Sequence, residues 1–183
     1  MTAAVQSPVH GGLSAPVDRI DSAAASAAAG LPTIEVGEVD ATTLYRIADG
    51  TLTPLVGPMA KADYDSVLAS GAIERDGKKW AWTIPIVLPA TDAEAAAATD
   101  GAKLALTHGG KPFGVLEVSG GAYDWDKAAF IKAVYRTDRT DHPGARLWTS
   151  DERTKLVGGT ITLAPANDDR PFAKRVMSPA HTR

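Results

Sequence analysis

The histidines are the first residues to examine, because histidine is the side chain best suited to acid–base catalysis near neutral pH. The chain has four of them: His10, His108, His142 and His181. No two are three or four residues apart, which excludes the helical histidine pair of many zinc sites. His142 shares a segment with Asp138 and Asp141. This grouping allows either a His–Asp dyad or a hydrogen bond that orders the loop.

Other nucleophiles and cofactor motifs are absent from the sequence. There is no cysteine, which excludes disulfides, thiolate catalysis and cysteine-ligated zinc. A serine hydrolase elbow, Gly-x-Ser-x-Gly, does not occur, and Ser119-Gly120-Gly121 is more simply a loop between a strand and a helix. The Rossmann and P-loop glycine patterns are also missing. We therefore predict no catalytic residue, no metal site and no cofactor.

Glycine pairs and tryptophans offer weaker signals for ligand binding. The pairs at 109–110, 120–121 and 158–159 could hold phosphate through exposed N–H groups, or they could form plain turns. Trp80 and Trp82 are two residues apart, so on a strand both would face the same side. They could stack on nucleic-acid bases or lie in the core.

Composition limits the class of protein further. The 183 residues are 44% hydrophobic and 22% charged, which suits one globular domain. Residues 1–92 carry a net charge of −5 and residues 93–183 a net charge of +2, and the total of −3 argues against nonspecific nucleic-acid binding. No apolar run is long enough to span a bilayer and no signal peptide is recognisable, so we predict a cytoplasmic protein without membrane contact.

The elements that must position these residues alternate irregularly between helix and strand. We predict short helices near 22–29, 40–47, 59–68, 91–98 and 125–135. Strands are predicted at 33–36, 80–88 and 155–163, with Pro85 at an edge or bulge. A hairpin should join 104–106 to 113–118 across the turn at 108–111. This order favours an α+β fold around a small barrel-like sheet.

Seven fragments, in order along nearly the whole chain, carry a family resemblance. Residues 10–12 (His-Gly-Gly) and 17–19 resemble the opening of ATP sulfurylases, which are sulfate adenylyltransferases. Residues 53–59 (Thr-Pro-Leu-Val-Gly-Pro-Met), followed by Asp63-Tyr64, resemble the family's Ser-Pro-Leu-x-Gly-Phe-Met and Asp-Tyr. Further fragments of this kind lie at 82–88, 110–116, 123–127, 142–144 and 157–161.

The resemblance implies a PUA-like pseudo-barrel of short mixed strands with peripheral helices. It also marks twelve positions, which we expect to be structural rather than catalytic: Gly57, Met59, Asp63, Tyr64, Pro85, Asp126, Lys127, His142, Pro143, Gly144, Gly158 and Gly159. Two positions depart from the family pattern, since Pro58 replaces a usual Phe and Arg136 replaces a common Gly.

The motifs that bind nucleotide and sulfate in the resembled family do not occur in this sequence. Those motifs are Gln-x-Arg-Asn and His-x-x-His, whereas this chain has one glutamine, Gln6, and one asparagine, Asn167. We therefore expect an accessory domain of sulfate assimilation, inactive alone, from a truncated or split enzyme. Two alternatives stay open: a free-standing PUA-like module that binds RNA or another ligand, and a structural subunit of a larger assembly.

The predicted organisation has three parts. Residues 1–17 form an extended arm, 18–168 the PUA-like domain, and 169–183 a basic tail or linker toward a catalytic domain. Ser178 and Pro179 resemble the first residues of a helix. Expected partners are a catalytic domain supplied by another chain, or further copies of this chain.

Overall fold

A computed structural model describes residues 8–166 and 175–182 of the chain. The first seven residues of the predicted arm, the last two residues of the predicted domain (167–168), and residues 169–174 and 183 of the predicted tail lie outside the described residues.

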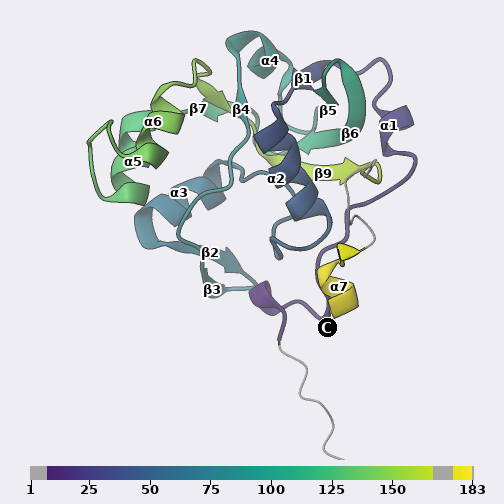
Figure 1. The fold of residues 1–183 in the computed structure, drawn as a ribbon, viewed down its shortest axis with the longest axis horizontal. Coiled ribbons are helices and arrows are strands. Elements are labelled where there is room, and N and C mark those ends of the chain that lie inside the picture. The colour runs from purple at the N-terminus through teal and green to yellow at the C-terminus, as the bar shows by residue number, and fades with distance from the viewer. Residues whose placement is uncertain (1–7, 167–174, 183) are drawn as a thin grey trace, which may run out of the picture.

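The largest sheet has the strand order β1-β5-β6-β9 (Figure 1). β1 (Thr33–Glu35) runs parallel to β5 (Lys103–His108), and the remaining neighbours, β6 (Lys111–Val118) and β9 (Gly159–Leu163), pair antiparallel. β5 and β6 form the predicted hairpin, turning at Gly109 and Gly110 where both φ angles are positive. Alternation along these strands buries Leu104, Leu106 and Leu116 on one face of the sheet.

The outer edge of β9 is paired with two irregular segments rather than with another strand. The N–H groups of Gly159 and Ile161 donate to the carbonyls of Pro58 and Val56, at 3.0 and 2.9 Å. The N–H of Leu163 donates to the Arg19 carbonyl at 2.9 Å. Residues 19–21 and 56–58 therefore complete this side of the sheet.

Two smaller sheets complete the strand structure. β2 (Ala72–Arg75) and β3 (Lys78–Ala81) form a hairpin. β4 (Pro89–Ala90), β8 (Lys155–Leu156) and β7 (Tyr123–Asp124) form the third sheet, with β8 central.

The prediction of one strand over 80–88 is wrong. The strand ends at Ala81, and the chain has no regular structure from Trp82 to Leu88. Pro85 lacks an N–H and cannot donate to a ladder. The Trp82 side chain donates to the Ile84 carbonyl at 2.9 Å, and the Ile86 carbonyl accepts from Met59 N–H at 2.9 Å. Local and loop contacts thus replace strand pairing here.

The helices are short, and several have clear terminal signals. They are α1 (Ala24–Ala27), α2 (Glu38–Ala48), α3 (Lys61–Ser70), α4 (Asp92–Ala97), α5 (Lys127–Tyr135), α6 (Pro143–Thr149) and α7 (Pro179–Thr182), with a 3-10 turn η1 (His10–Gly12). Thr91 and Glu94 form a capping box at the start of α4, the helix predicted near 91–98. The helices predicted from the sequence do not include α6, which begins at Pro143.

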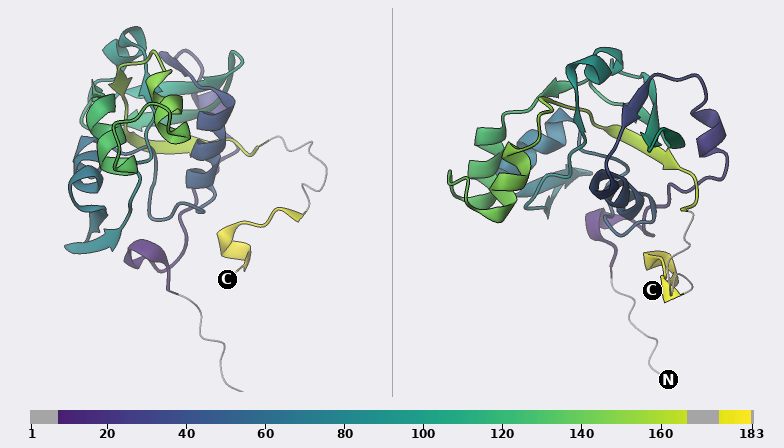
Figure 2. Two further views of the ribbon diagram at one scale, coloured as in Figure 1. Left: turned by 60° about the vertical axis from the view of Figure 1, so that its left-hand side comes forward. Right: turned by 45° about the horizontal axis from the view of Figure 1, so that its top comes forward.

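One apolar core joins these layers. α2 packs its buried Leu44 and Ile47 on the sheet, whereas α1 lies against β6 and β9 on the opposite face. α5 and α6 lie side by side at the end of the molecule away from α1 (Figures 1 and 2). Aromatic side chains of Trp125, Phe130 and Trp148 pack edge to face between them.

The α+β fold class is confirmed: helices and short mixed strands share one core, and the three sheets of the described residues do not close into a barrel.

Candidate functional site

The first cluster of motif residues lies where residues 56–60 cross residues 157–161, which we call the glycine crossing. Besides the β9 edge bonds, Ser119 N–H donates to the Gly158 carbonyl at 3.0 Å. Three backbone segments, from the 56–60 loop, the end of β6 and the start of β9, therefore meet within hydrogen-bond distance.

Glycine is required at this crossing because the backbones leave no room for a Cβ atom. A Cβ on Gly57 would lie 1.9 Å from the Gly159 carbonyl oxygen. One on Gly158 would lie 2.3 Å from the backbone N of Ala60, and one on Gly159 would lie 2.1 Å from the Glu117 carbonyl oxygen. Backbone atoms cannot yield as a flexible side chain would, so these three glycines are fixed by packing.

Met59 joins the crossing to a buried aromatic cluster. Its side chain is buried, and its carbonyl accepts a 2.8 Å hydrogen bond from the Tyr123 hydroxyl. Tyr64 lies against Tyr123 and stacks on Phe130, with ring centroids 5.6 and 6.3 Å apart.

Burial governs the chemistry of both tyrosines. It raises the pKa of Tyr64 to about 12, with a further contribution from the charge of Asp126. It also raises the pKa of Tyr123 well above its ordinary value. Neither hydroxyl is therefore an acid or base near neutral pH.

Asp63, the next motif residue, forms a two-pronged ion pair with Arg75. The guanidinium donates to both carboxylate oxygens, at 2.9 and 2.6 Å, and both side chains are about 70% buried. The carboxylate raises the pKa of Arg75 still further above neutrality. The ion pair connects Arg75 of the β2–β3 hairpin to Asp63 of α3. The sequence gives no local signal for this contact.

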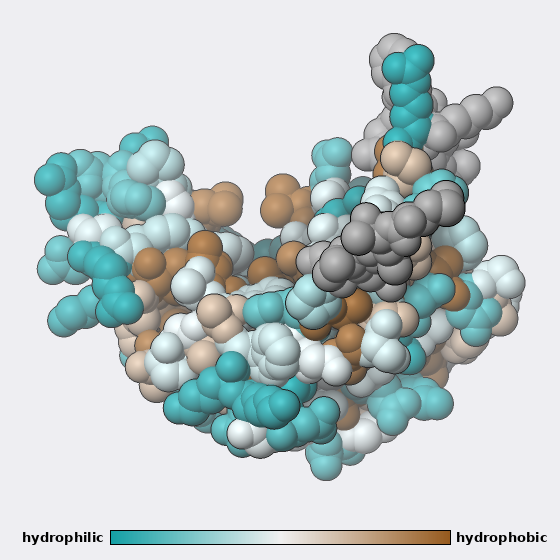
Figure 3. Space-filling model, turned by 90° about the horizontal axis from the view of Figure 1, so that it is seen from below, coloured by the Kyte–Doolittle hydropathy of each residue, from teal (hydrophilic) through white to brown (hydrophobic). Residues whose placement is uncertain are grey.

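A small cavity of about 120 Å³ lies between the glycine crossing and this ion pair. Its walls include the exposed side chain of Val56. Pro85 does not line the cavity and is buried in the irregular segment from Trp82 to Leu88. Figure 3 shows apolar side chains exposed among hydrophilic ones on the face of the molecule that is seen from below.

The remaining motif residues lie apart from this cavity, at the ends of α5 and α6. Asp126 caps α5 by accepting from Ala129 N–H at 2.9 Å, and Lys127 donates to the Asp151 carbonyl. His142 caps α6, where Nδ1 accepts from Gly144 and Ala145 N–H at 3.2 and 3.4 Å.

Pro143 and Gly144 complete the start of α6. Pro143 occupies the first helical position, where its missing N–H costs nothing. A Cβ on Gly144 would lie 2.5 Å from the Tyr135 ring, so glycine lets this ring approach the helix.

Three of the four histidines, His10, His108 and His142, form hydrogen bonds through their side chains that hold the fold together. His108 Nδ1 donates to the Val36 carbonyl at 2.8 Å, and His10 Nε2 donates to the Ala81 carbonyl at 3.2 Å. His142 uses Nδ1 as an acceptor, as the loop-ordering alternative predicts. His10 also packs against Trp80 and Trp82, so both tryptophans are partly buried.

The glycine pairs also direct N–H groups to acceptors within the chain. Gly110 N–H donates to the Glu35 carboxylate at 3.4 Å and Gly120 N–H to Asp100 at 2.7 Å. With Gly159 bonded to Pro58, each pair contains an N–H that is not available to hold phosphate. Within 8–166 and 175–182, no three His, Asp or Glu residues lie together as a metal site would require.

A second ionic cluster was not foreseen from the sequence. Arg153 donates to Asp151 at 2.6 Å and to Asp40 of α2 at 3.1 Å, with all three side chains largely buried. Burial alone raises the pKa of Asp151, but the hydrogen bonds from Arg153 outweigh it and hold the pKa below the ordinary value. Arg153 and Asp40 are 113 positions apart in sequence, so no local pattern signals this pair.

Comparisons with known proteins agree on the fold and on the relatives. The sequence model of the PUA-like domain family matches residues 8–166. Sulfate adenylyltransferase from Pyropia yezoensis is 57% identical over 97% of this chain, and the same-named proteins of Cenarchaeum symbiosum and Deinococcus radiodurans are 36% and 34% identical over 85%. The chain spans 42%, 40% and 38% of their lengths.

A solved structure shares the fold. "Hexameric APS kinase from Thiobacillus denitrificans" matches 94% of this chain with a TM-score of 0.62 at 24% identity, over 29% of its own length. None of the helices in the described residues combines the length and apolar character needed to cross a membrane.

Proposed function

The chain belongs to the PUA-like domain family, and from this premise we propose that it is a non-catalytic accessory domain of a sulfate adenylyltransferase. Its work is to fold independently and to support a nucleotidyltransferase domain that joins ATP and sulfate into adenylyl sulfate and pyrophosphate.

One observation carries the proposal. The chain is 57% identical to the Pyropia yezoensis sulfate adenylyltransferase over 97% of its own length, but it spans only 42% of that relative. Within the described residues, three motif side chains that could do chemistry have structural roles. His142 caps a helix, Asp63 holds a hairpin, and Tyr64 is buried with a raised pKa. The twelve motif positions then serve packing and capping.

The same reasoning extends to organisation and partners. We propose an arm over 1–17, a PUA-like domain over 18–168 and a basic tail or linker over 169–183. The partner is a catalytic domain, supplied by another chain or by an assembly of copies. The relatives' greater length and the hexameric assembly named for the structural neighbour support this proposal. The expected location is the cytoplasm, where ATP is available.

Two measurements test the proposal. The purified chain, given ATP and sulfate, should produce no adenylyl sulfate above a heat-denatured control. The region of the Pyropia yezoensis enzyme that this chain does not match should then be mixed with the chain. Light scattering should detect a complex, and the mixture should have more activity than that region alone.

The two measurements separate two ways of being wrong. Turnover by the purified chain would contradict the absence of catalysis. Absence of both a complex and a gain in activity would contradict the accessory role, provided that circular dichroism shows both partners folded.

A further inference from the structure

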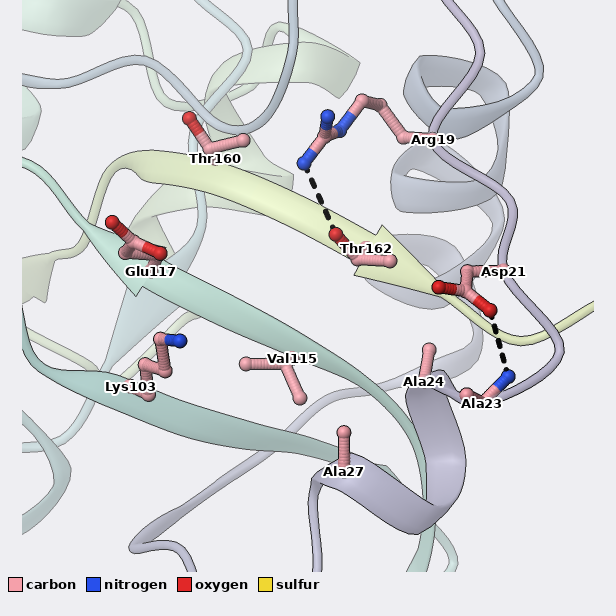
Figure 4. Close-up of a pocket in the computed structure, with 10 residues that line it drawn as sticks. All are labelled: Arg19, Asp21, Ala23, Ala24, Ala27, Lys103, Val115, Glu117, Thr160 and Thr162. Carbon is pink, nitrogen blue, oxygen red and sulfur yellow. Dashed lines mark hydrogen bonds between the residues drawn. The ribbon is translucent and has the colours of Figure 1, made fainter.

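A cavity of about 250 Å³ lies between α1 and the sheet face opposite the main core (Figure 4). Because strand side chains alternate, Val115 and Glu117 of β6 both point to this face, as do Thr160 and Thr162 of β9. The small side chains of α1, Ala24 and Ala27 among them, leave the space open. Arg19, Val115 and Thr160 belong to fragments that carry the family resemblance, but none of the twelve marked positions lines this cavity.

Arg19 is held in place at one side of the cavity. Its Nε donates to the Ile161 carbonyl at 2.8 Å and its Nη2 to the Thr162 hydroxyl at 3.1 Å. These bonds fix the guanidinium plane, and no carboxylate of the described residues pairs with it. A fixed guanidinium with uncommitted N–H groups is suited to a carboxylate.

Two further side chains of opposite charge, Lys103 and Glu117, line the cavity together with the apolar Val115. Lys103 and Glu117 are direct cross-strand partners in the β5–β6 ladder. Cross-strand pairs of opposite charge usually meet. Here, among the residues that the structure describes, neither side chain has a hydrogen bond or ion pair, and both border the cavity. Each is therefore free to meet a charged ligand.

The charges at the cavity balance, and this balance selects the ligand. Arg19 and Lys103 supply two positive groups, and Glu117 and Asp21 two negative ones. An anion such as sulfate would be attracted by the first pair and repelled by the second. A cation would be attracted by the second pair and repelled by the first. A molecule with both charges separated by a short aliphatic chain would find both partners, with Val115 beneath the chain.

We propose that this cavity binds a small zwitterion that carries a primary ammonium and a carboxylate. The carboxylate lies on Arg19 and the ammonium on Glu117. Its volume is below that of typical drug-sized sites, which suits a molecule the size of an amino acid.

The test is an NMR titration of the full chain with glycine, β-alanine and 4-aminobutyrate, and with acetate, ethylammonium and sulfate as singly charged or doubly negative controls. At least one zwitterion should give saturable shifts at the amides of Val115 and Thr162. The three controls should bind at least about fivefold more weakly, because each lacks one partner.

One exposed variant and one matched control connect the shifts to the cavity. Glu117→Gln lies at its border, whereas Glu152→Gln changes an exposed charge outside it. Glu117→Gln should weaken the zwitterion by about fivefold and Glu152→Gln should leave it unchanged. Sulfate binding better than every zwitterion, or equal loss in both glutamate variants, would overturn the proposal.

Discussion

Gly158 illustrates how tightly single residues are constrained where three backbone segments meet. Its missing side chain is what allows residues 59 and 60 to pass. Replacing a hydrogen by a methyl group there sets a carbon against the peptide group between Met59 and Ala60, and the two segments must separate locally to accept it.

We therefore expect Gly158→Ala to destabilise the protein by about 3 kcal/mol or more, as overpacking against backbone does. Gly37→Ala is the matched control, because Gly37 has open space around its Cβ position and a negative φ. It should cost no more than about 1 kcal/mol, the range for a helix N-cap. Urea unfolding measures both, and equal losses would contradict the packing argument.

A second prediction at this scale concerns alkaline pH. Burial raises the pKa of Tyr64 from its ordinary 10.0 to about 12, so the folded state favours the neutral phenol. This contribution to stability is complete below pH 10 and is lost as the pH rises through the folded value.

The free energy of unfolding should accordingly fall between about pH 10 and 12, and less steeply in Tyr64→Phe, which has no such proton. Denaturant titrations at several pH values measure the slope. If the variant and the parent chain decline in parallel, Tyr64 is not the group that titrates.

At the scale of elements, α6 depends on its unusual histidine cap. We expect His142→Ala to cost about 1 kcal/mol, because two N–H groups at the start of the helix lose their acceptor. His142→Asn should retain most of the stability, since asparagine is among the best N-cap residues.

Thermal unfolding compares the two variants. His142 also packs on Tyr135, with ring centroids 4.8 Å apart. If both variants lose the same stability, this ring contact rather than the cap is what His142 contributes.

Sequence predicted the elements whose signals are local. The β5–β6 hairpin has a glycine turn between strands in which apolar residues alternate with others. The capping box at Thr91 marks the start of α4. The α6 helix was missed because seven residues show little periodicity, and the strand over 80–88 was overextended because β-forming residues outweighed Pro85. In these cases tertiary contacts decide the backbone.

The candidate sites follow the same division. The crossing glycines were marked by resemblance, but their reason, contact between segments about 100 positions apart, appears only in the fold. Pairs such as Asp63 with Arg75 likewise depend on how the elements are placed. Nothing along the chain marked the cavity beside α1, because its walls come from four separate segments.

At the scale of the whole molecule, Arg153 ties α2 to the segment after α6 through Asp40 and Asp151. The lowered pKa of Asp151 means that the folded state favours its charged form. This contribution is present above the ordinary value of 3.8 and is lost as the pH falls through the lower, folded value.

Asp151→Asn should therefore destabilise the protein by about 1–2 kcal/mol at neutral pH, and the difference from the parent chain should shrink below about pH 4. Urea unfolding at pH 7 and at acidic pH measures this difference. Glu152→Gln, an exposed neighbour, serves as the control. A pH-independent difference would show that shape rather than charge matters at residue 151.

The segments that run along β9 also affect how this protein behaves at high concentration. An unpaired edge strand can pair with another copy of the same chain, and amyloid fibrils can begin in this way. Here the backbone donors at 159, 161 and 163 are already occupied from within, and at the far border Glu94 accepts from the Glu35 N–H. These backbone donors are therefore unavailable to a second copy, and we expect this sheet to resist edge-to-edge association for as long as the fold holds.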